Sequence, residues 1–168
     1  MLYVCSLARL SETVTATGAR HLVTLIGAGT AVSRPTMIDE RNHLFLAFDD
    51  IVEPVPGLMA PAELHVERLI AFFRAWDRQA PMVVHCFAGI SRSTAGAYIA
   101  ACALTPERDE ADIAAALRRV APSATPNARL VALADRALGR DGRMVEAIKA
   151  IGRGADAFEG APFLMPIG

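Results

Sequence analysis

The segment from Met82 to Leu104 constrains the fold of this 168-residue chain more than any other. It begins with a short apolar, β-branched run, Met82–His85, which is typical of a strand buried on both faces of a parallel sheet. The run ends on Cys86, and the next residues form a turn in which Gly89 lets the backbone curl without a Cβ. The rest of the segment has the pattern of a helix. A buried strand, a tight turn and a helix in this order are expected in an α/β fold.

Hydrophobic periodicity predicts alternating strands and helices in the first half of the chain and helices in the second half. Further strands are expected at Leu2–Cys5, His21–Ile26 and His43–Phe48. Further helices are expected at Ser6–Thr17, Pro61–Arg78, Asp109–Val120, Asn127–Leu138 and Arg143–Ile151, with Pro61 in a first helical position. This order predicts an α/β fold: a central, mainly parallel sheet of about four to five strands flanked by helices, with a helical C-terminal half.

The chain is long enough for one compact core, and no linker divides it, so we expect residues 1–168 to form a single domain. Residues 153–168 contain Gly and Pro but also several large apolar side chains. We expect this tail to pack on the body of the domain, and an interface with another molecule is the alternative.

Composition and charge exclude several classes of protein. The formal net charge of −1 gives no reason to expect a nucleic-acid or membrane partner. No apolar run approaches the roughly 20 residues that span a bilayer, and the N-terminus lacks the pattern of a signal peptide. The three cysteines, Cys5, Cys86 and Cys102, are too few and too scattered for a disulfide framework or a zinc site. We therefore expect a cytoplasmic protein without a metal or other cofactor.

A cysteine followed six positions later by an arginine is weak evidence by itself, because two cysteines of this chain meet that condition. Cys86 precedes Arg92 in this way, and Cys102 precedes Arg108. The second pair lies in a helical run that Pro106 interrupts, without a preceding strand or an intervening glycine. We assign Cys102 to the core, and only Cys86 has the sequence context of a functional site.

The turn after Cys86 has the features of a phosphate-binding loop. A parallel strand delivers Cys86 to the carboxyl edge of the sheet, where open α/β folds bind their ligands. The backbone amides of the turn can then point at one anion, and Ser91 is a suitable N-cap for the following helix. The helix N-terminus and the planar Arg92 add positive charge, which favours the thiolate form of Cys86. The expected phosphate-binding residues are Phe87, Ala88, Gly89, Ile90, Ser91 and Arg92.

The sequence HCFAGISRST, from His85 to Thr94, resembles the HCxxGxxRS/T signature of protein tyrosine phosphatases, and most closely their compact, dual-specificity-like branch. TPNARL, from Thr125 to Leu130, resembles the Pro-Asn segment that opens a late helix in dual-specificity phosphatases. The resemblance implies that Cys86 is the nucleophile, that Arg92 binds the phosphate, and that a phosphocysteine forms without a metal.

The same resemblance implies a general acid on a loop some 30 to 40 residues before the cysteine. Asp49 and Asp50 lie 37 and 36 positions before Cys86. We prefer Asp50, because the alternation of the preceding strand places it further into the loop, and we assign Asp49 a supporting role. The alternative is that both are solvated turn residues.

Three further residues are expected to have supporting roles, and those of Ser93 and His85 are implied by the resemblance. Ser93 is expected to assist departure of the thiolate when the phosphocysteine is hydrolysed. His85 is expected to be a buried, hydrogen-bonded histidine that supports the loop. A general-base role is disfavoured, because adjacent strand residues point to opposite faces. Asn127 is expected to cap the late helix, and bracing of the active-site loops is the alternative.

The predicted function is therefore a cysteine-dependent phosphatase that hydrolyses phosphomonoesters. The turn has no Lys or Arg between Cys86 and Arg92, where phosphoinositide phosphatases of the superfamily that it resembles tend to carry basic residues. The resemblance therefore implies phosphotyrosine or mixed phosphoprotein substrates rather than highly charged inositides. Small phosphoesters remain open as substrates. Two alternatives are a phosphate-binding module with little turnover and a rhodanese-like sulfurtransferase.

Overall fold

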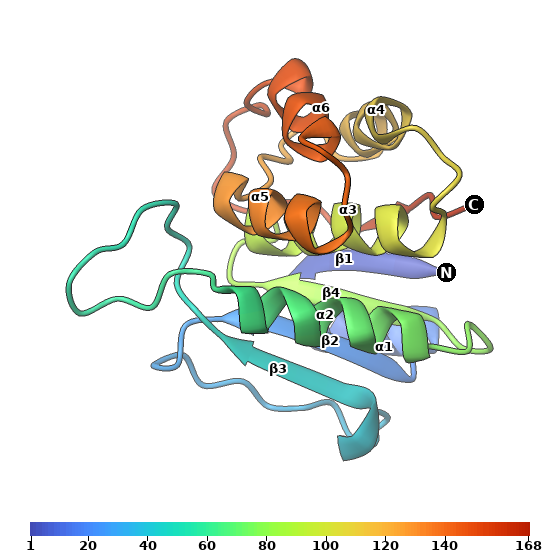
Figure 1. Ribbon diagram of the computed structural model, residues 1–168. Coiled ribbons are helices and arrows are strands. Elements are labelled where there is room, and N and C mark those ends of the chain that lie inside the picture. Colours follow the sequence, from blue (N-terminus) through green and yellow to red (C-terminus); the bar gives the residue numbers. More distant parts are fainter.

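The computed structural model describes residues 1–168 and contains one five-stranded sheet with helices on both faces (Figure 1). The strands are β1 (Leu2–Ser6), β2 (His21–Ile26), β3 (His43–Ala47), β4 (Met82–Cys86) and β5 (Phe163–Met165). Their order across the sheet is β3-β2-β4-β1-β5. The first four strands run parallel, and β5 pairs antiparallel with β1. The predicted α/β fold with a mainly parallel sheet is confirmed.

The helices are α1 (Leu10–Thr17), α2 (Glu63–Ala75), α3 (Arg92–Leu104), α4 (Glu110–Val120), α5 (Ala128–Ala137) and α6 (Arg143–Ile151), with a short 3₁₀ turn at Glu40–Asn42. Two predicted helix starts are too early. Ser6 belongs to β1, where it pairs with Cys86, and its hydroxyl accepts a hydrogen bond from the Arg9 amide. Pro61 precedes α2 rather than opening it, because Ala62 still has an extended conformation.

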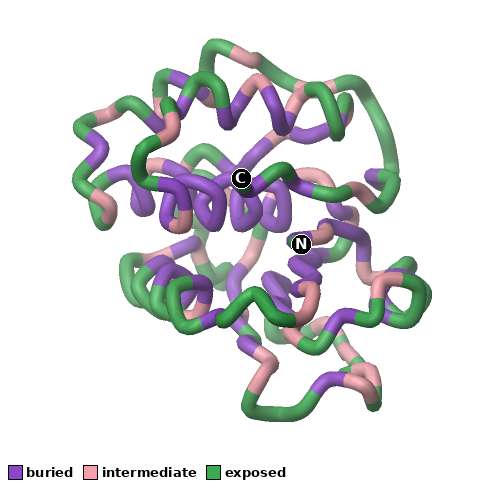
Figure 2. Tube along the Cα trace, turned by 90° about the vertical axis from the view of Figure 1, so that its right-hand side faces the viewer, coloured by how far each residue is buried: buried purple, intermediate pink, exposed green.

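The sheet separates two hydrophobic clusters. The larger cluster lies under α2 and α3 and includes Met82, Val84 and Cys86 of β4. The smaller cluster lies under α1 and includes Cys5 and Val83. Strand β4 is buried over its whole length, as its sequence predicts, and Figure 2 shows the buried residues concentrated in the middle of the molecule.

Helix α3 packs directly on the sheet and is buried along almost its whole length. A Cβ built on Gly96 would lie 2.9 Å from a methyl group of Leu25, so glycine permits this close approach. The short distance between helix and sheet places Arg92 and Ser93, in the first turn of α3, next to the end of β4.

The C-terminal segment leaves α6, crosses the turn after β4 and ends as the edge strand β5 (Figure 1). On its way, the Ala155 amide donates to the Pro122 carbonyl over 2.9 Å, and the Gly160 amide donates to the Ala88 carbonyl over 2.8 Å. The sequence did not predict β5, because three residues are too few to display a strand periodicity. None of the helices combines the length and the hydropathy that a transmembrane span requires.

Candidate active site

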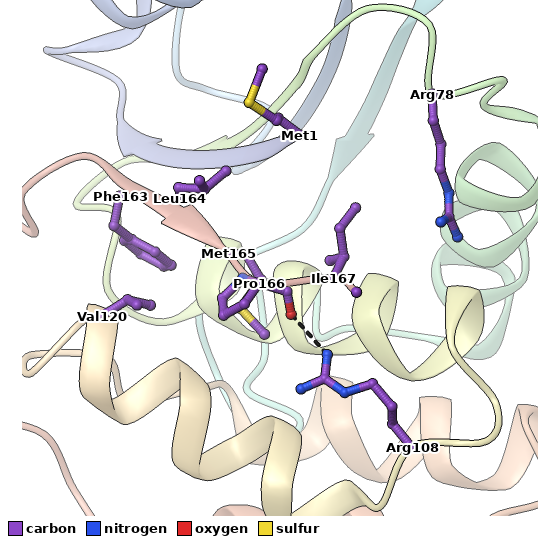
Figure 3. Close-up of a pocket in the computed structure, with 10 residues that line it drawn as sticks. Met1, Arg78, Arg108, Val120, Phe163, Leu164, Met165, Pro166 and Ile167 are labelled. Carbon is purple, nitrogen blue, oxygen red and sulfur yellow. Dashed lines mark hydrogen bonds between the residues drawn. The ribbon is translucent and has the colours of Figure 1, made fainter.

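The residues selected from the sequence meet at the carboxyl edge of the parallel strands. The turn after β4, the loop after β3 and the start of α5 contribute them. A hollow of about 830 Å³ lies elsewhere, beside Met1, Arg78 and β5 (Figure 3). Because Met1 and Arg78 precede β1 and β4 in the chain, this hollow is at the opposite end of the sheet from Cys86.

Backbone carbonyls of the turn Phe87–Ser91 are tied to segments that surround it. The pairs are Leu7 N–H to Phe87 O at 3.1 Å, Gly160 N–H to Ala88 O at 2.8 Å, Thr125 N–H to Ile90 O at 2.9 Å and Asn127 N–H to Ser91 O at 3.2 Å. The amides of residues 87, 88, 90 and 91 have no acceptor within the protein. Because backbone donors are rarely left unpaired, this arrangement is a cradle for an anion.

Gly89 has a conformation and a packing environment that require glycine. Its φ is 71°, and a Cβ built there would lie 2.9 Å from the Ser6 nitrogen of β1. Its amide donates a hydrogen bond to Cys86 Sγ over 3.3 Å. The glycine therefore lets the turn pass close to β1 and aims one N–H at the sulfur.

Cys86 is the last residue of β4, and its side chain is 2% exposed. Its Sγ lies 3.1 Å from Ser93 Oγ in the first turn of α3. When the sulfur is a thiolate, the Ser93 hydroxyl is the donor of this contact. As a thiolate, Cys86 therefore accepts from two donors, the Gly89 amide and the Ser93 hydroxyl.

Arg92 is buried, and its guanidinium is only partly satisfied by the protein. Nη1 donates to the Phe48 carbonyl over 3.0 Å, which fixes the side chain against the end of β3. Nε is buried and has no hydrogen-bond partner. A buried guanidinium with a free donor beside an amide cradle is suited to a phosphate oxygen.

The two aspartates after β3 have different partners. Asp50 Oδ1 accepts a hydrogen bond from Ser91 Oγ over 2.7 Å, so its carboxylate lies at the turn after β4. Asp49 Oδ2 instead accepts from the Met59 amide over 2.8 Å, which closes its own loop. Of the two, Asp50 is the one whose carboxylate contacts the cradle.

Ser91 occupies the N-cap position of α3, but its side chain makes no capping hydrogen bond. The prediction that Ser91 caps this helix with its side chain is therefore wrong. The hydroxyl donates to Asp50 instead, and Thr94 Oγ1 donates to the carbonyls of Ile90 and Ser91 at 2.6 and 3.1 Å. The first amides of α3 remain available to an anion as a result.

Asn127 does more than cap a helix. Its Oδ1 accepts from the Leu130 amide over 2.9 Å, as an N-cap should. Its Nδ2 donates to Asp50 Oδ1 over 2.8 Å and to the Ile51 carbonyl over 3.3 Å. The expectation of capping alone is too narrow, because the same side chain also holds the loop after β3.

His85 is fully buried beneath the turn, with both ring nitrogens near a partner. Its Nδ1 lies 3.3 Å from the Cys86 carbonyl and its Nε2 lies 2.8 Å from Thr24 Oγ1. Thr24 Oγ1 is also 2.8 Å from His43 Nε2. Burial lowers the pKa of His85 to about 4, so the imidazole is neutral near pH 7. The sequence contained no signal for the part played by Thr24.

The other two cysteines are inert thiols in the core. Burial raises the pKa of Cys5 and of Cys102 to about 12. Cys5 belongs to the smaller cluster under α1, whereas Cys86 belongs to the larger cluster on the other face of the sheet. No group of three or more His, Cys, Asp or Glu side chains is arranged to hold a metal ion.

Comparison with known protein families finds a match that includes the turn after β4. The protein-tyrosine phosphatase family matches residues 56–123, which contain α2, β4, the turn, α3 and α4. Among curated protein sequences, none matches this chain.

Solved structures of phosphatases share the fold. A Cydia pomonella PTP-2 phosphatase is 20% identical with a TM-score of 0.63, over 80% of this chain and 84% of that one. Human DUSP28 is 19% identical with a TM-score of 0.61, over 90% of this chain and 95% of that one. DUSP15 is 18% identical with a TM-score of 0.62, over 89% and 90%.

Proposed function

We propose that the chain is a compact, dual-specificity-like member of the protein tyrosine phosphatase superfamily and that it hydrolyses phosphomonoesters with Cys86 as nucleophile. The observation that carries the proposal is the cradle over the sulfur. Carbonyls of the turn after β4 accept hydrogen bonds from surrounding segments, and the amides of residues 87, 88, 90 and 91 have no acceptor within the protein. The buried Arg92 Nε also has no partner. A phosphoryl dianion satisfies these donors and lies next to the nucleophile.

The first step is attack of the Cys86 thiolate on phosphorus. The phosphorus–sulfur bond forms as the phosphorus–oxygen bond to the leaving group breaks, while Arg92 and the loop amides hold the equatorial oxygens. Asp50 gives its proton to the leaving oxygen, which departs as a neutral alcohol or phenol. Contact of Asp50 with Ser91, at the edge of the cradle, supports this role.

The second step is hydrolysis of the phosphocysteine. The Asp50 carboxylate takes a proton from water as the water oxygen attacks phosphorus, and the sulfur leaves as a thiolate. Ser93 stabilises that thiolate by donating its hydroxyl proton in a hydrogen bond, for which its 3.1 Å distance from Cys86 Sγ is suitable. His85 supports the loop from below and takes no proton in this scheme.

The surface near the loop supports a phosphoprotein substrate. Phe87 in the turn is 61% exposed, and Val52 and Met59 of the loop after β3 are 48% and 57% exposed. No Lys or Arg lies between Cys86 and Arg92. These features fit a monophosphate with apolar neighbours, such as phosphotyrosine, better than a polyanion, a nucleic acid or an anionic membrane surface.

We also propose that the 168 residues act as one cytoplasmic domain. A single sheet joins strands from both ends of the chain, because β5 pairs with β1, and this supports one domain rather than two. The three cysteines are free, which supports a reducing compartment.

The test is hydrolysis of an aryl phosphate by the wild type and by Cys86→Ser. Loss of the nucleophile should lower kcat by at least about a thousandfold, while inorganic phosphate should still protect the variant against thermal unfolding. Wild-type rates in Cys86→Ser would refute the nucleophile assignment. Chelation of metals should leave the wild-type rate unchanged.

Two results would favour the alternatives. A wild-type protein that binds phosphate but hydrolyses neither phosphotyrosine nor phosphoserine peptides would be a binding module. Thiocyanate formation from thiosulfate and cyanide, without phosphoester hydrolysis, would identify a sulfurtransferase. The ratio of rates on the two phosphopeptides would define the substrate class.

A further inference from the structure

The peptide unit that joins Ala88 to Gly89 is hydrogen-bonded on both sides. Its carbonyl oxygen accepts from the Gly160 amide over 2.8 Å, and its N–H donates to Cys86 Sγ over 3.3 Å. A peptide unit is planar, so its C=O and N–H point in opposite directions as one rigid group. A donor that fixes the carbonyl therefore also fixes the direction of the N–H that faces the sulfur.

Gly160 can make this contact only as glycine. It is buried, and a Cβ built on it would lie 2.6 Å from the Gly89 carbonyl oxygen and 3.2 Å from the Gly89 carbonyl carbon. Both atoms are backbone and cannot rotate away. Any larger residue would push the C-terminal segment off the turn.

The neighbouring Glu159 anchors Gly160 next to β1. The Ser6 hydroxyl donates to Glu159 Oε1 over 2.6 Å, and Ser6 is the register partner of Cys86 in the sheet. Ser6 is fully buried, so this contact holds the exposed Glu159 to a rigid part of the fold.

The segment is also held on either side of Glu159 and Gly160. Before it, the Gly154 amide donates to Thr125 Oγ1 over 3.0 Å and the Ala155 amide donates to the Pro122 carbonyl over 2.9 Å. After it, β5 pairs with β1. The Gly160 amide is therefore held in a fixed position by the contacts on both sides of it.

We propose that Gly160 is a positioning residue of the active site, whose amide acts through the Ala88–Gly89 peptide to hold the Gly89 N–H on the sulfur of Cys86 and so favours the thiolate. A hydrogen bond to a peptide carbonyl also polarises the unit and strengthens the bond that its N–H donates. Glu159 and Ser6 set the position of Gly160. The inference rests on the proposed function only in assigning a catalytic purpose to the thiolate.

The sharpest test replaces the amide between Glu159 and Gly160 by an ester, introduced by semisynthesis of the short C-terminal segment. The ester removes one N–H and preserves the shape of the chain. The pH midpoint of Cys86 alkylation by iodoacetamide should rise by about half a unit to one unit, the size expected for one lost hydrogen bond. A matched ester between Arg153 and Gly154 removes the hydrogen bond to Thr125 and should leave the midpoint unchanged.

A recombinant version compares Gly160→Ala with Gly154→Ala. Gly154 is crowded even more tightly than Gly160, since a Cβ on Gly154 would lie 2.5 Å from the Ser123 carbonyl oxygen and 2.6 Å from the Ala124 carbonyl oxygen. Both variants should lose stability, but only Gly160→Ala should raise the alkylation midpoint. If Gly160→Ala does not fold, the alkylation midpoint of the ester protein provides the test.

The outcomes separate this inference from the proposed function. An unchanged midpoint in the folded ester protein or in folded Gly160→Ala would overturn the role of Gly160, whatever the hydrolysis rates. Equal midpoint shifts in the Gly154 and Gly160 variants would overturn it too. A shift confined to Gly160, in a protein that hydrolyses no phosphoester, would support the positioning role and refute the phosphatase.

Discussion

Asn127 Nδ2 donates to Asp50 Oδ1 over 2.8 Å, and this hydrogen bond joins two segments that are 77 residues apart in the sequence. The same oxygen accepts from Ser91 Oγ over 2.7 Å. The loop after β3, the phosphate cradle and the start of α5 are therefore connected through one carboxylate. The contact gives the loop a defined position beside the cradle.

The first prediction concerns the two aspartates. Asp50→Asn should lower kcat on an alkyl phosphate by about 10²- to 10³-fold, because a poor leaving group needs the proton. The loss should be much smaller on an aryl phosphate with a low-pKa leaving group. Asp49→Asn removes a charge that bonds only to its own loop, so its rates should stay within about fivefold of wild type on both substrates. The reverse pattern would assign the acid to Asp49.

The second prediction concerns Asn127. Asn127→Ala should cost about 1 kcal/mol of unfolding free energy through loss of the α5 N-cap, and should also lower kcat through loss of the contact with Asp50. Asn127→Ser keeps a capping hydroxyl but is too short to reach Asp50. It should restore the stability and not the rate, as measured by denaturant unfolding and steady-state kinetics. Recovery of both in the serine variant would show that the bridge to Asp50 does not matter.

The third prediction concerns Gly89. Gly89→Ala combines a φ of 71° with a Cβ 2.9 Å from the Ser6 nitrogen. We expect a loss of about 1–3 kcal/mol of stability and loss of phosphate binding, measured by calorimetry. Gly139→Ala is the matched control, because Gly139 has a φ of 63° and no heavy atom within 4 Å of a built Cβ. It should lose about 1 kcal/mol and bind phosphate normally. Normal phosphate binding by folded Gly89→Ala would contradict the cradle.

The fourth prediction concerns pH and His85. Burial lowers its folded-state pKa to about 4, below the ordinary histidine value of 6.5, so the unfolded chain binds more protons between these two pH values. The unfolding free energy should therefore rise with pH across this window, and His85 should contribute about 3 kcal/mol that is lost between pH 6.5 and pH 4.

Other histidines also have lowered pKa values, so the His85 share is obtained by difference. His85→Gln retains a side chain able to hydrogen-bond with Thr24 but does not titrate. Its unfolding free energy, measured by urea at several pH values, should vary less steeply than that of wild type below pH 6.5. Identical slopes in the two proteins would show that His85 is not the group responsible.

The sequence by itself determined the cradle, because the necessary residues are contiguous. A buried strand that ends on Cys86, a glycine in the turn and an arginine at the start of a helix leave a local pattern that periodicity and turn preferences can detect. The same local logic predicted most helices and the parallel strands, and Arg143–Ile151 was predicted to the residue. It did not predict how Ser91 would use its hydroxyl, because accepting a capping hydrogen bond and donating to Asp50 need different orientations of the same side chain.

Only the tertiary structure decided what surrounds the cradle. The contacts from Asn127 to Asp50, from Thr24 to His85 and from Gly160 to Ala88 join segments remote in the sequence. Such contacts cannot be detected as a periodic pattern in the sequence, because each involves a single residue that the order of the strands brings into place. Gly160 has no distinguishing feature in the sequence of the C-terminal tail. Only the fold places its amide nitrogen 2.8 Å from the Ala88 carbonyl oxygen, in the peptide unit whose N–H faces the sulfur of Cys86.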